Sequence, residues 1–206
     1  MRHSRLLLVA LLSSFFVSCA SSFTESEKTV IRSGEKEIMA LVTVRSDKSS
    51  RSILRQMARP LSRKMLATDA YKDLRRRMLA TVQDPNDEGV GIAAPQVGIS
   101  RRIIAVQRYD KPGEPFEIYI NPKILSRSDS LVAGMEGCLS VPGLYGKVER
   151  AQNIRLCYRD EHYRQHTEEV KGFTAVIFQH EVDHLNGILF TDRMIPGSEI
   201  LESEKK

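Results

Sequence analysis

Two stretches of the chain repeat apolar residues at the spacing of an α-helix. In residues 69–83 the apolar stripe consists of Tyr71, Leu74, Met78 and Val82. In residues 173–190 it consists of Ala175, Phe178, Val182, Leu185 and Leu189. Thr68 is a suitable N-cap for the first stretch, and Asp84-Pro85-Asn86-Asp87 predicts a turn after it. The pattern therefore predicts two amphipathic helices whose apolar faces turn towards a core.

Runs of β-branched and aliphatic residues lie between these two predicted helices. Residues 102–107 and 116–120 are two such runs, and Asn121-Pro122 is expected to end the second. Residues 153–158 and 167–171 predict a hairpin with a polar tip. Strands between two helices predict an α+β domain with an antiparallel-rich sheet.

The N-terminal end of the chain has the layout of a secretory signal. Residues 1–24 contain no acidic residue, and Arg2 and Arg5 precede the apolar run 6–12, which small residues follow. The segment that ends at Cys19 resembles a bacterial lipobox, in which the cysteine carries a lipid. Cys19 is therefore the expected lipid anchor of a protein exported to the cell envelope. The alternatives are an uncleaved apolar extension, an organellar presequence and a cytoplasmic location.

These patterns divide the chain into four parts. Residues 1–19 are expected to form the signal- or lipoprotein-like leader, and the polar, aperiodic residues 20–37 a linker. Residues 38–195 are expected to form the folded domain, and residues 196–206 a charged tail. No apolar run reaches the roughly 18 residues that a membrane-spanning helix needs.

Composition supports a folded and mildly basic protein. Of its 206 residues, 41% are hydrophobic and 28% charged, which suits a chain with a core. Three cysteines are too few for a disulfide scaffold, and their odd number argues against complete pairing. The net charge of +5 is compatible with visiting an anionic surface. Arg75-Arg76-Arg77 could contact ribosomal RNA, although such a charge run is more often a solvated face.

Candidate chemistry lies inside the second predicted helix, in the motif His180-Glu181-Val182-Asp183-His184. Two histidines four residues apart lie on one helix face, so both imidazoles can reach one metal ion. Glu181, beside the first histidine, can hold a metal-bound water and take its proton as a general base. A surface helix that happens to carry two histidines is disfavoured, because this helix is largely apolar.

A catalytic metal site needs a third protein ligand, and Cys138 is the best candidate. Its thiolate is a soft ligand, and nearby glycines predict a tightly turned loop at residues 136–143. Cys157 lies in a strand-like run and is expected to be core, whereas His162 and His166 are expected on an exposed hairpin. Glutamates in the charged tail are a poorer source of a ligand, because little chain follows to fix them.

A third segment, Gly89-Val90-Gly91-Ile92-Ala93-Ala94-Pro95-Gln96, is rich in small residues. Small residues let the backbone approach an extended ligand closely. Gln96 can offer an amide N–H to a developing oxyanion. Pro95 and the lack of a following apolar helix argue against a dinucleotide-binding fingerprint.

Taken together and in this order, the three segments resemble the hallmarks of the peptide deformylase family. They read GVGIAAPQ at 89–96, EGCLS at 136–140 and HEVDH at 180–184. The resemblance covers roughly residues 39–194. It implies an α+β fold: a compact single domain in which antiparallel-rich sheets pack around a central HExxH helix. It also implies an enzyme that hydrolyses the formyl group of N-formylmethionyl peptides, which gives formate and a free amine.

The resemblance also assigns roles to residues of this chain. The implied metal ligands are Cys138, His180 and His184. The implied catalytic groups are Glu181 as general base and acid, and Gln96 and the backbone N–H of Leu139 at the oxyanion. The implied substrate-binding residues are Val90, Gly91 and Glu136, of which the first and last lie near the pocket for the methionine side chain. The implied metal is ferrous iron, with zinc, nickel or cobalt as alternatives, and an iron–thiolate site is expected to be oxygen-sensitive.

The chain departs from the family's pattern in three places. A leader is unusual for an enzyme of nascent chains, and the tail after Met194 is short, so ribosome contact stays open. Residues 144–147 lack an arginine that some members carry, and Lys147 or Arg150 could hold the peptide backbone instead. A monomer is expected. Two other functions stay in view: a related envelope metal-dependent amidase or peptidase, and a non-enzymatic lipoprotein that binds formylated peptides.

Overall fold

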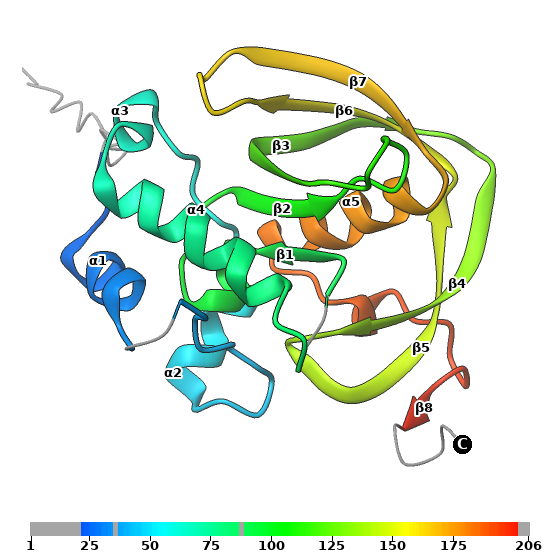
Figure 1. Ribbon diagram of the computed structural model, residues 1–206. Helices are drawn as coiled ribbons and strands as arrows, with labels where there is room; N and C mark the ends of the chain where they lie inside the picture. Colours follow the sequence, from blue (N-terminus) through cyan, green and yellow to red (C-terminus); the bar gives the residue numbers. More distant parts are fainter. Residues whose placement is uncertain (1–21, 35–36, 87–88, 202–206) are drawn as a thin grey trace, which may run out of the picture.

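Two antiparallel sheets frame the protein in the computed structural model, which describes residues 22–34, 37–86 and 89–201. The larger sheet has the order β1-β2-β3-β6-β7, with β1 Gly91–Ala93, β2 Ile103–Gln107, β3 Phe116–Arg127, β6 Asn153–Arg159 and β7 Gln165–Lys171. The smaller sheet has the order β4-β5-β8, with β4 Leu131–Cys138, β5 Val141–Ala151 and β8 Ile200–Leu201. Every strand pair within these two sheets is antiparallel, which confirms the predicted α+β class (Figure 1).

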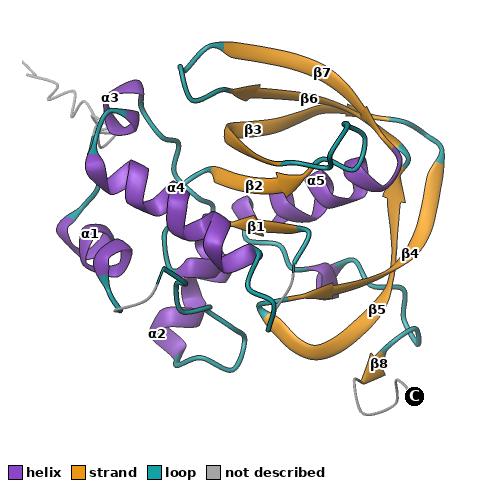
Figure 2. Ribbon diagram, viewed as in Figure 1, coloured by secondary structure: helices purple, strands orange, loops and turns teal. Residues whose placement is uncertain are grey.

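Helices cover both faces of the larger sheet. On one face lies α4 Asp69–Val82, against which α1 Glu25–Arg32 packs. On the other face lies α5 Gly172–Leu185, which also contacts β5 of the smaller sheet (Figure 2). The shorter helical segments are α2 Lys48–Arg51, α3 Arg63–Leu66 and the 3-10 turns η1 Ser52–Arg55, η2 Ala94–Val97 and η3 Phe190–Asp192.

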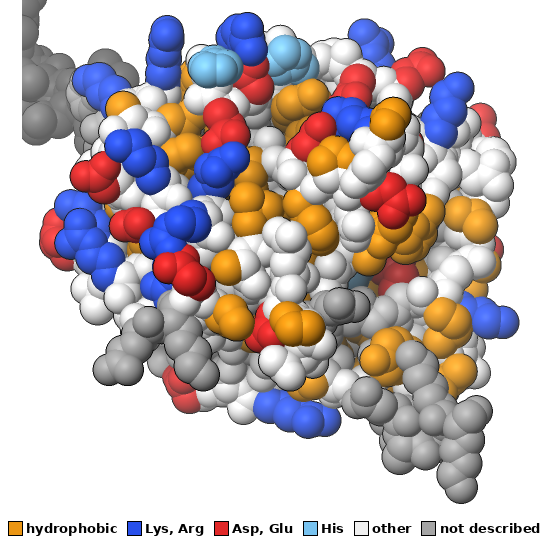
Figure 3. Space-filling view, viewed as in Figure 1, with side chains coloured by type: hydrophobic (Ala, Val, Ile, Leu, Met, Phe, Trp, Pro, Cys, Tyr) orange, Lys and Arg blue, Asp and Glu red, His pale blue; other side chains and the backbone are white. Residues whose placement is uncertain are grey.

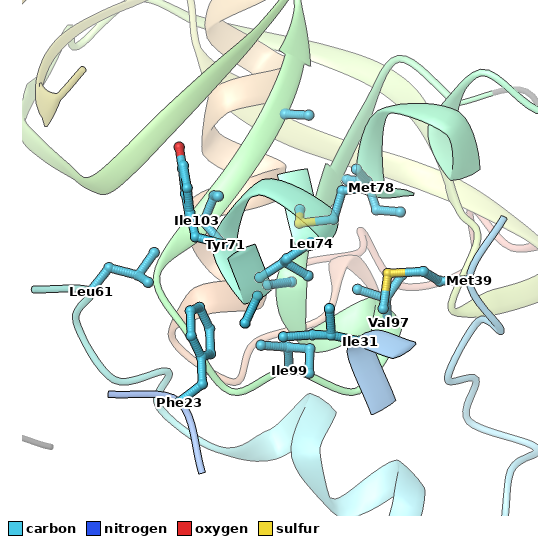
Figure 4. Close-up of a cluster of buried hydrophobic side chains, with 14 of the residues drawn as sticks. Phe23, Ile31, Met39, Leu61, Tyr71, Leu74, Met78, Val97, Ile99 and Ile103 are labelled. Atoms are coloured by element: carbon cyan, nitrogen blue, oxygen red, sulfur yellow. The ribbon is translucent and has the colours of Figure 1, made fainter. Parts of the chain in front are cut away.

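Strand β2 shows how the sheet separates two cores. Its side chains alternate, so Ile103 and Ala105 join the core under α4, while Ile104 and Val106 join the core under α5. Figure 4 shows the first core, in which side chains from α4, α1 and the sheet interdigitate. The second core fixes α5 on the sheet and thereby positions the residues of its C-terminal half.

Both predicted helices form, with one difference in length. α4 begins after Thr68, whose hydroxyl accepts the N–H of Tyr71 at 3.3 Å, as the cap pattern predicts. α5 ends at Leu185 rather than at Phe190. Gly187 follows with a φ of +74°, and a β-carbon there would lie 2.7 Å from the backbone of Arg55. The turn therefore stops the helix and lets two backbones touch.

The prediction of a linker at 20–37 is wrong for the described residues of that segment. Residues 25–32 form α1, with a capping box between Thr24 and Glu27. Phe23 and Ile31 are buried in the core beside α4. The segment looked polar in the sequence because one of its buried positions is occupied by a charged residue, Glu27. The carboxylate of Glu27 is bound by Arg101, 74 residues further along the chain.

The expected solvated face at 75–77 is also wrong for Arg77. This side chain is 5% exposed and donates hydrogen bonds to backbone carbonyls of Ile31, Glu37 and Ile38. It therefore joins α4 to the N-terminal segment and is not available to an RNA partner.

Three further predictions, of a strand end, a loop and a tail, need correction. β3 continues through Asn121-Pro122 to Arg127, because a register shift between Ile120 and Lys123 absorbs the proline. The expected loop at 136–143 is instead the end of β4, a short turn and the start of β5. The charged tail contributes β8, which pairs with Leu144 and Tyr145 of β5.

No helix among the described residues is long and apolar enough to cross a membrane. The leader and Cys19 lie outside the described residues.

Candidate active site

Three side chains that could hold a metal ion, called the metal-binding group below, meet where the end of β4 faces α5. They are Cys138, the last residue of β4, and His180 and His184, one turn apart on α5. One ligand atom from each residue lies within 4.8 Å of the other two, and Sγ of Cys138 is 3.2 Å from Nε2 of His184. The structure thus brings together the three residues that the sequence singled out as metal ligands.

The chemistry of these three donors fits a divalent transition-metal ion. Burial and the neighbouring charge of His180 hold the pKa of His184 well below its usual range, so this imidazole has a lone pair to give. Two N–H groups point at the sulfur of Cys138: the backbone N–H of Ser140 at 3.4 Å and Nε2 of Gln96 at 3.6 Å. Three protein ligands of this kind leave one position for water or substrate, as a catalytic site requires.

A buried carboxylate fixes the orientation of His180. Nδ1 of His180 lies 2.8 Å from Oε2 of Glu136, which leaves its Nε2 for the metal-binding group. Burial alone would raise the pKa of Glu136, but hydrogen bonds from Arg150 and His180 overcome this and lower it to about 2. Burial likewise disfavours charge on His180, yet hydrogen bonds to Cys138 and Glu136 raise the pKa of this histidine well above its usual value. A metal ion would replace the proton on Nε2 of His180, while the bond of Nδ1 to Glu136 keeps the ring oriented as a ligand.

Behind Glu136 lies a chain of charged side chains that the sequence did not reveal. Arg150 of β5 donates to both oxygens of Glu136, at 2.8 and 2.9 Å, and to Asp183 on the far side. Arg193 donates to the same Asp183 at 2.6 and 2.8 Å. Arg150 is only 4% exposed, so the expectation that it could hold a peptide backbone is wrong. Lys147 is exposed on β5, and its role stays a prediction.

Glu181 lies buried beside the metal-binding group. Its side chain is on α5 next to His180, and the residue is 3% exposed. Its Oε2 has no hydrogen-bond partner among the described residues. Burial raises the pKa of Glu181 to about 7, despite the opposing charge of His180. A carboxyl group with a pKa near neutrality can both take up and return a proton.

The opposite wall of the site comes from β1 and η2. Oε1 of Gln96 accepts the backbone N–H of Ala93 at 2.7 Å, which turns its Nε2 towards Cys138. Gly91 lies so close to α5 that a β-carbon there would be 2.6 Å from Oε1 of Glu181. Leu139 follows β4 in the short turn before β5. The small residues of this segment therefore do allow a close approach, here to the helix.

Several of these groups border one cavity of about 350 Å³, although His184 is not among its lining residues. Of the residues singled out from the sequence, it is lined by Val90, Gly91, Gln96, Glu136, Cys138, Leu139, His180 and Glu181. Figure 3 shows a hollow on this face of the molecule, with hydrophobic side chains on its rim and an acidic side chain inside. A cavity with an apolar rim and a few converging polar groups is the usual form of a small-ligand site.

The remaining cysteine and histidines of the described residues lie outside this group. Cys157 is on β6 in the larger sheet and is half-buried, so it belongs to the core less fully than expected. His162 is exposed at the tip of the β6–β7 hairpin, as predicted. His166 lies in β7 on the same hairpin and binds Asp160, with 2.9 Å between Nε2 and Oδ2.

Comparison with known proteins agrees with this geometry. The family model described as polypeptide deformylase matches residues 39–199. A peptide deformylase of Synechocystis is 42% identical over 155 residues, which cover 75% of this chain and 80% of that protein. The class I type b peptide deformylase of Acinetobacter baumannii with Met-Ala-Ser bound has a TM-score of 0.67 and 39% identity, over 76% of this chain and 98% of that chain. Its actinonin-bound structure has a TM-score of 0.66 and 39% identity, over 77% and 99%.

These matches span nearly the whole length of the related structures. They favour neither a different envelope amidase nor a binding protein without activity. The chain therefore belongs to the polypeptide deformylase family and is an enzyme of that kind, a deformylase hydrolase.

Proposed function

We propose that this enzyme hydrolyses the formyl amide of N-formylmethionyl peptides and releases formate and a free amino terminus. The observation that carries the proposal is the buried carboxylate of Glu181, with one oxygen unpartnered, which lines one cavity with Cys138 and His180, two members of the Cys138–His180–His184 group. The related Acinetobacter enzyme with Met-Ala-Ser bound supports a peptide ligand of this kind.

Cys138, His180 and His184 would hold the metal ion, and we propose ferrous iron, with zinc, nickel or cobalt able to take its place. When bound, such an ion supplies a water molecule of lowered pKa and polarises the formyl oxygen. The protein's part is to keep His180 oriented through Glu136 and to keep the thiolate of Cys138 in contact with N–H donors.

The chain's own donors would hold the developing oxyanion. The amide of Gln96 is fixed by its bond to Ala93, so its Nε2 needs no reorganisation when charge develops. The backbone N–H of Leu139, in the turn after β4, is the second proposed donor. Gly91 of β1 would hydrogen-bond the peptide backbone, which extends along the cavity beside it.

Glu181 would move the proton. Its unpartnered Oε2 takes a proton from the attacking water, and the protonated carboxyl then donates it to the leaving amine nitrogen. The pKa of about 7 suits both steps, because neither direction of transfer is strongly uphill near neutral pH.

The methionine side chain would enter the apolar part of the cavity. The apolar residues that line it include Val90, Phe173, Val176 and Ile177. Glu136 lines the same region, but its carboxylate is occupied by His180 and Arg150. It therefore acts on the substrate pocket only through the residues that it holds.

The direct test is formate release from formyl-Met-Ala-Ser by the full chain, purified without oxygen and loaded with ferrous iron. Glu181→Gln should bind as much iron as the wild type and lose about 10²- to 10⁴-fold in turnover, the usual contribution of a general base. Unchanged turnover in this variant would remove Glu181 from the mechanism. No formate from any formyl peptide by the iron-loaded wild type would refute the function.

The place where the enzyme acts is a separate proposal, supported by the leader sequence alone. We propose that Cys19 is lipidated and anchors the protein to the cell envelope. Growth of expressing bacteria on an alkyne-bearing fatty acid should label the wild type and not Cys19→Ala. Equal labelling of both, or of neither, would contradict the anchor.

A further inference from the structure

A second cavity adjoins the active-site cavity. It has a volume of about 450 Å³ and lies between the β4–β5 hairpin and the first turns of α5. The two cavities share four lining residues: Met135, Glu136, Phe173 and Val176. The hollow in which we place the methionine side chain therefore borders a further space.

A glycine stands at the wall of this second cavity. Gly134 of β4 pairs with Val148 of β5, and Glu136 pairs with Gly146, so all four residues share one face of the hairpin. At Gly146 a β-carbon would collide with the side chain of Met194, which already fills that space. At Gly134 a β-carbon would meet no atom within 4 Å. The backbone at Gly134 has no positive φ, so other residues fit its conformation. Any larger residue would project into the second cavity.

The lining suits an apolar occupant. Glu136 and Arg150 border the cavity, but their charged groups bind each other and Asp183. Val176 contributes aliphatic surface, and the ring of Phe173, which is 56% exposed, lies against Tyr109 with 5.3 Å between ring centroids. An alkyl chain placed here would exchange water for aliphatic and aromatic surface.

We propose that the second cavity extends the pocket for the first side chain of the substrate, and that Gly134 keeps this extension open. The inference rests on the proposed function and deepens it. The substrates that it adds are formyl peptides whose first side chain is apolar and longer than that of methionine. A methionine side chain has four heavy atoms, on the order of 100 Å³ if each takes about the volume of a water molecule. The second cavity alone is larger than this.

The test uses a series of formyl tripeptides that differ only in the first residue: norleucine, 2-aminooctanoic acid and 2-aminodecanoic acid, each followed by Ala-Ser. The full chain is loaded with ferrous iron, and kcat/KM is measured for each. Each additional buried methylene contributes up to about fourfold. In the wild type, kcat/KM for the aminooctanoyl peptide should equal or exceed that for the norleucyl peptide. Gly134→Ile should lower the ratio of these two values by about tenfold or more.

Two further variants calibrate the result. Gly134→Ala adds one carbon where no atom lies within 4 Å, so it should fold and should lower the same ratio by a smaller factor. Ala133→Ile places the same isoleucine side chain at the neighbouring exposed residue, whose side chain points to the opposite face of β4, and should leave the ratio unchanged.

Two results would overturn the extension: a wild type that prefers norleucine over aminooctanoic acid by more than about tenfold, or a ratio that Gly134→Ile does not change. A second readout is independent of turnover. Calorimetry should show aminooctanoyl-Ala-Ser binding the wild type at least as tightly as Met-Ala-Ser, and Gly134→Ile should reverse that order. If no peptide is deformylated, the proposed function fails, whereas this binding order still decides whether the second cavity takes the longer side chain.

Discussion

Gly91 and Glu181 are packed so closely that residue 91 cannot carry a side chain without displacing the carboxylate. A β-carbon on Gly91 would lie 2.6 Å from Oε1 of Glu181 and 2.9 Å from its Cγ. It would also lie 2.9 Å from Cγ2 of Ile177, the residue one turn earlier on α5. The backbone of β1 therefore acts as a wall that keeps Glu181 directed towards the metal-binding group.

This contact predicts the effect of a single methyl group. Gly91→Ala should push Glu181 away from its place and lower kcat about 10²-fold, because displacements near 1 Å cost that much in catalysis. Iron content should stay near that of the wild type, since the three atoms nearest to the added β-carbon belong to Glu181 and Ile177 and not to a proposed metal ligand. Gly113→Ala is the matched control, because a β-carbon there meets nothing within 4 Å, although its φ of +77° costs some stability. Equal kcat in both variants would show that Glu181 tolerates the methyl group.

The two cysteines of the described residues give a second prediction. Cys138→Ser should lose bound iron or bind instead a metal that prefers oxygen ligands. The reason is that a hard serine oxygen replaces a soft thiolate. Cys157→Ser should keep its iron, since Cys157 lies on β6 in the other sheet. Metal analysis after purification without oxygen measures both. Equal iron content in the two variants would remove Cys138 from the ligand set.

The cluster of site residues could be predicted from the sequence, because each carries a local signal. His180 and His184 share a helix face by spacing alone, and their helix was recognisable from its apolar stripe. The third candidate ligand, Cys138, was marked by its short motif, although the motif suggested a loop and forms a strand end. Strand and turn could not be told apart there, since glycines weaken the alternating pattern of a strand.

Arg150 shows what local signals cannot give. Its partners, Glu136 and Asp183, are 14 and 33 residues away and lie on two different elements. Only the register of the β4–β5 hairpin places Arg150 on the same face as Glu136, and the turn that sets this register falls in the segment expected to be a loop. The supporting charges of the site were missed for this reason.

Removing Arg150 should damage both stability and metal binding. Arg150→Met leaves Glu136 without its main charge partner in a buried place, which costs about 3–5 kcal/mol for a broken buried pair. Because Glu136 orients His180, iron affinity should also fall, by about 10- to 100-fold. Denaturant unfolding and iron titration measure the two effects. Arg193→Met is the control, and both of its effects should be smaller. In this variant Asp183 still binds Arg150, and Glu136 still binds both Arg150 and His180.

Loss of stability without any loss of iron affinity in Arg150→Met would contradict the orienting role of Glu136. Equal loss of iron affinity in the two arginine variants would place the effect at Asp183 instead.

Helix α1 carries the last prediction, because one buried carboxylate attaches it to the domain. Glu27 is 6% exposed and binds Arg101 through both oxygens, at 2.7 and 2.9 Å, while Arg59 adds a contact at 3.1 Å. Burial raises the pKa of Glu27, but the hydrogen bonds from Arg101 and Thr24 outweigh it, and the net pKa is lowered.

The lowered pKa fixes the direction of the pH dependence. A carboxyl group whose pKa is lower in the folded state stabilises the fold above its unfolded value, about 4.3 for glutamate, and loses this contribution as the pH falls through the folded value. Glu27→Gln should therefore be less stable than the wild type by about 3–5 kcal/mol at pH 7. The difference should shrink steadily below about pH 4, where the wild-type carboxylate becomes protonated too.

Thermal unfolding of the full chain between neutral and acidic pH measures this difference. Glu25→Gln on the same helix is the matched control, because the ion pair of Glu25 with Lys28 is exposed and adds little to stability. A difference in stability between wild type and Glu27→Gln that stays constant across the whole pH range would show that the charge of Glu27 does not hold α1.

The same variant should make α1 accessible to proteolysis at Arg32 and should leave the metal-binding group unchanged. Among the described residues, the polar partners of the Glu27 side chain are Thr24, Arg59 and Arg101, which lie outside that group.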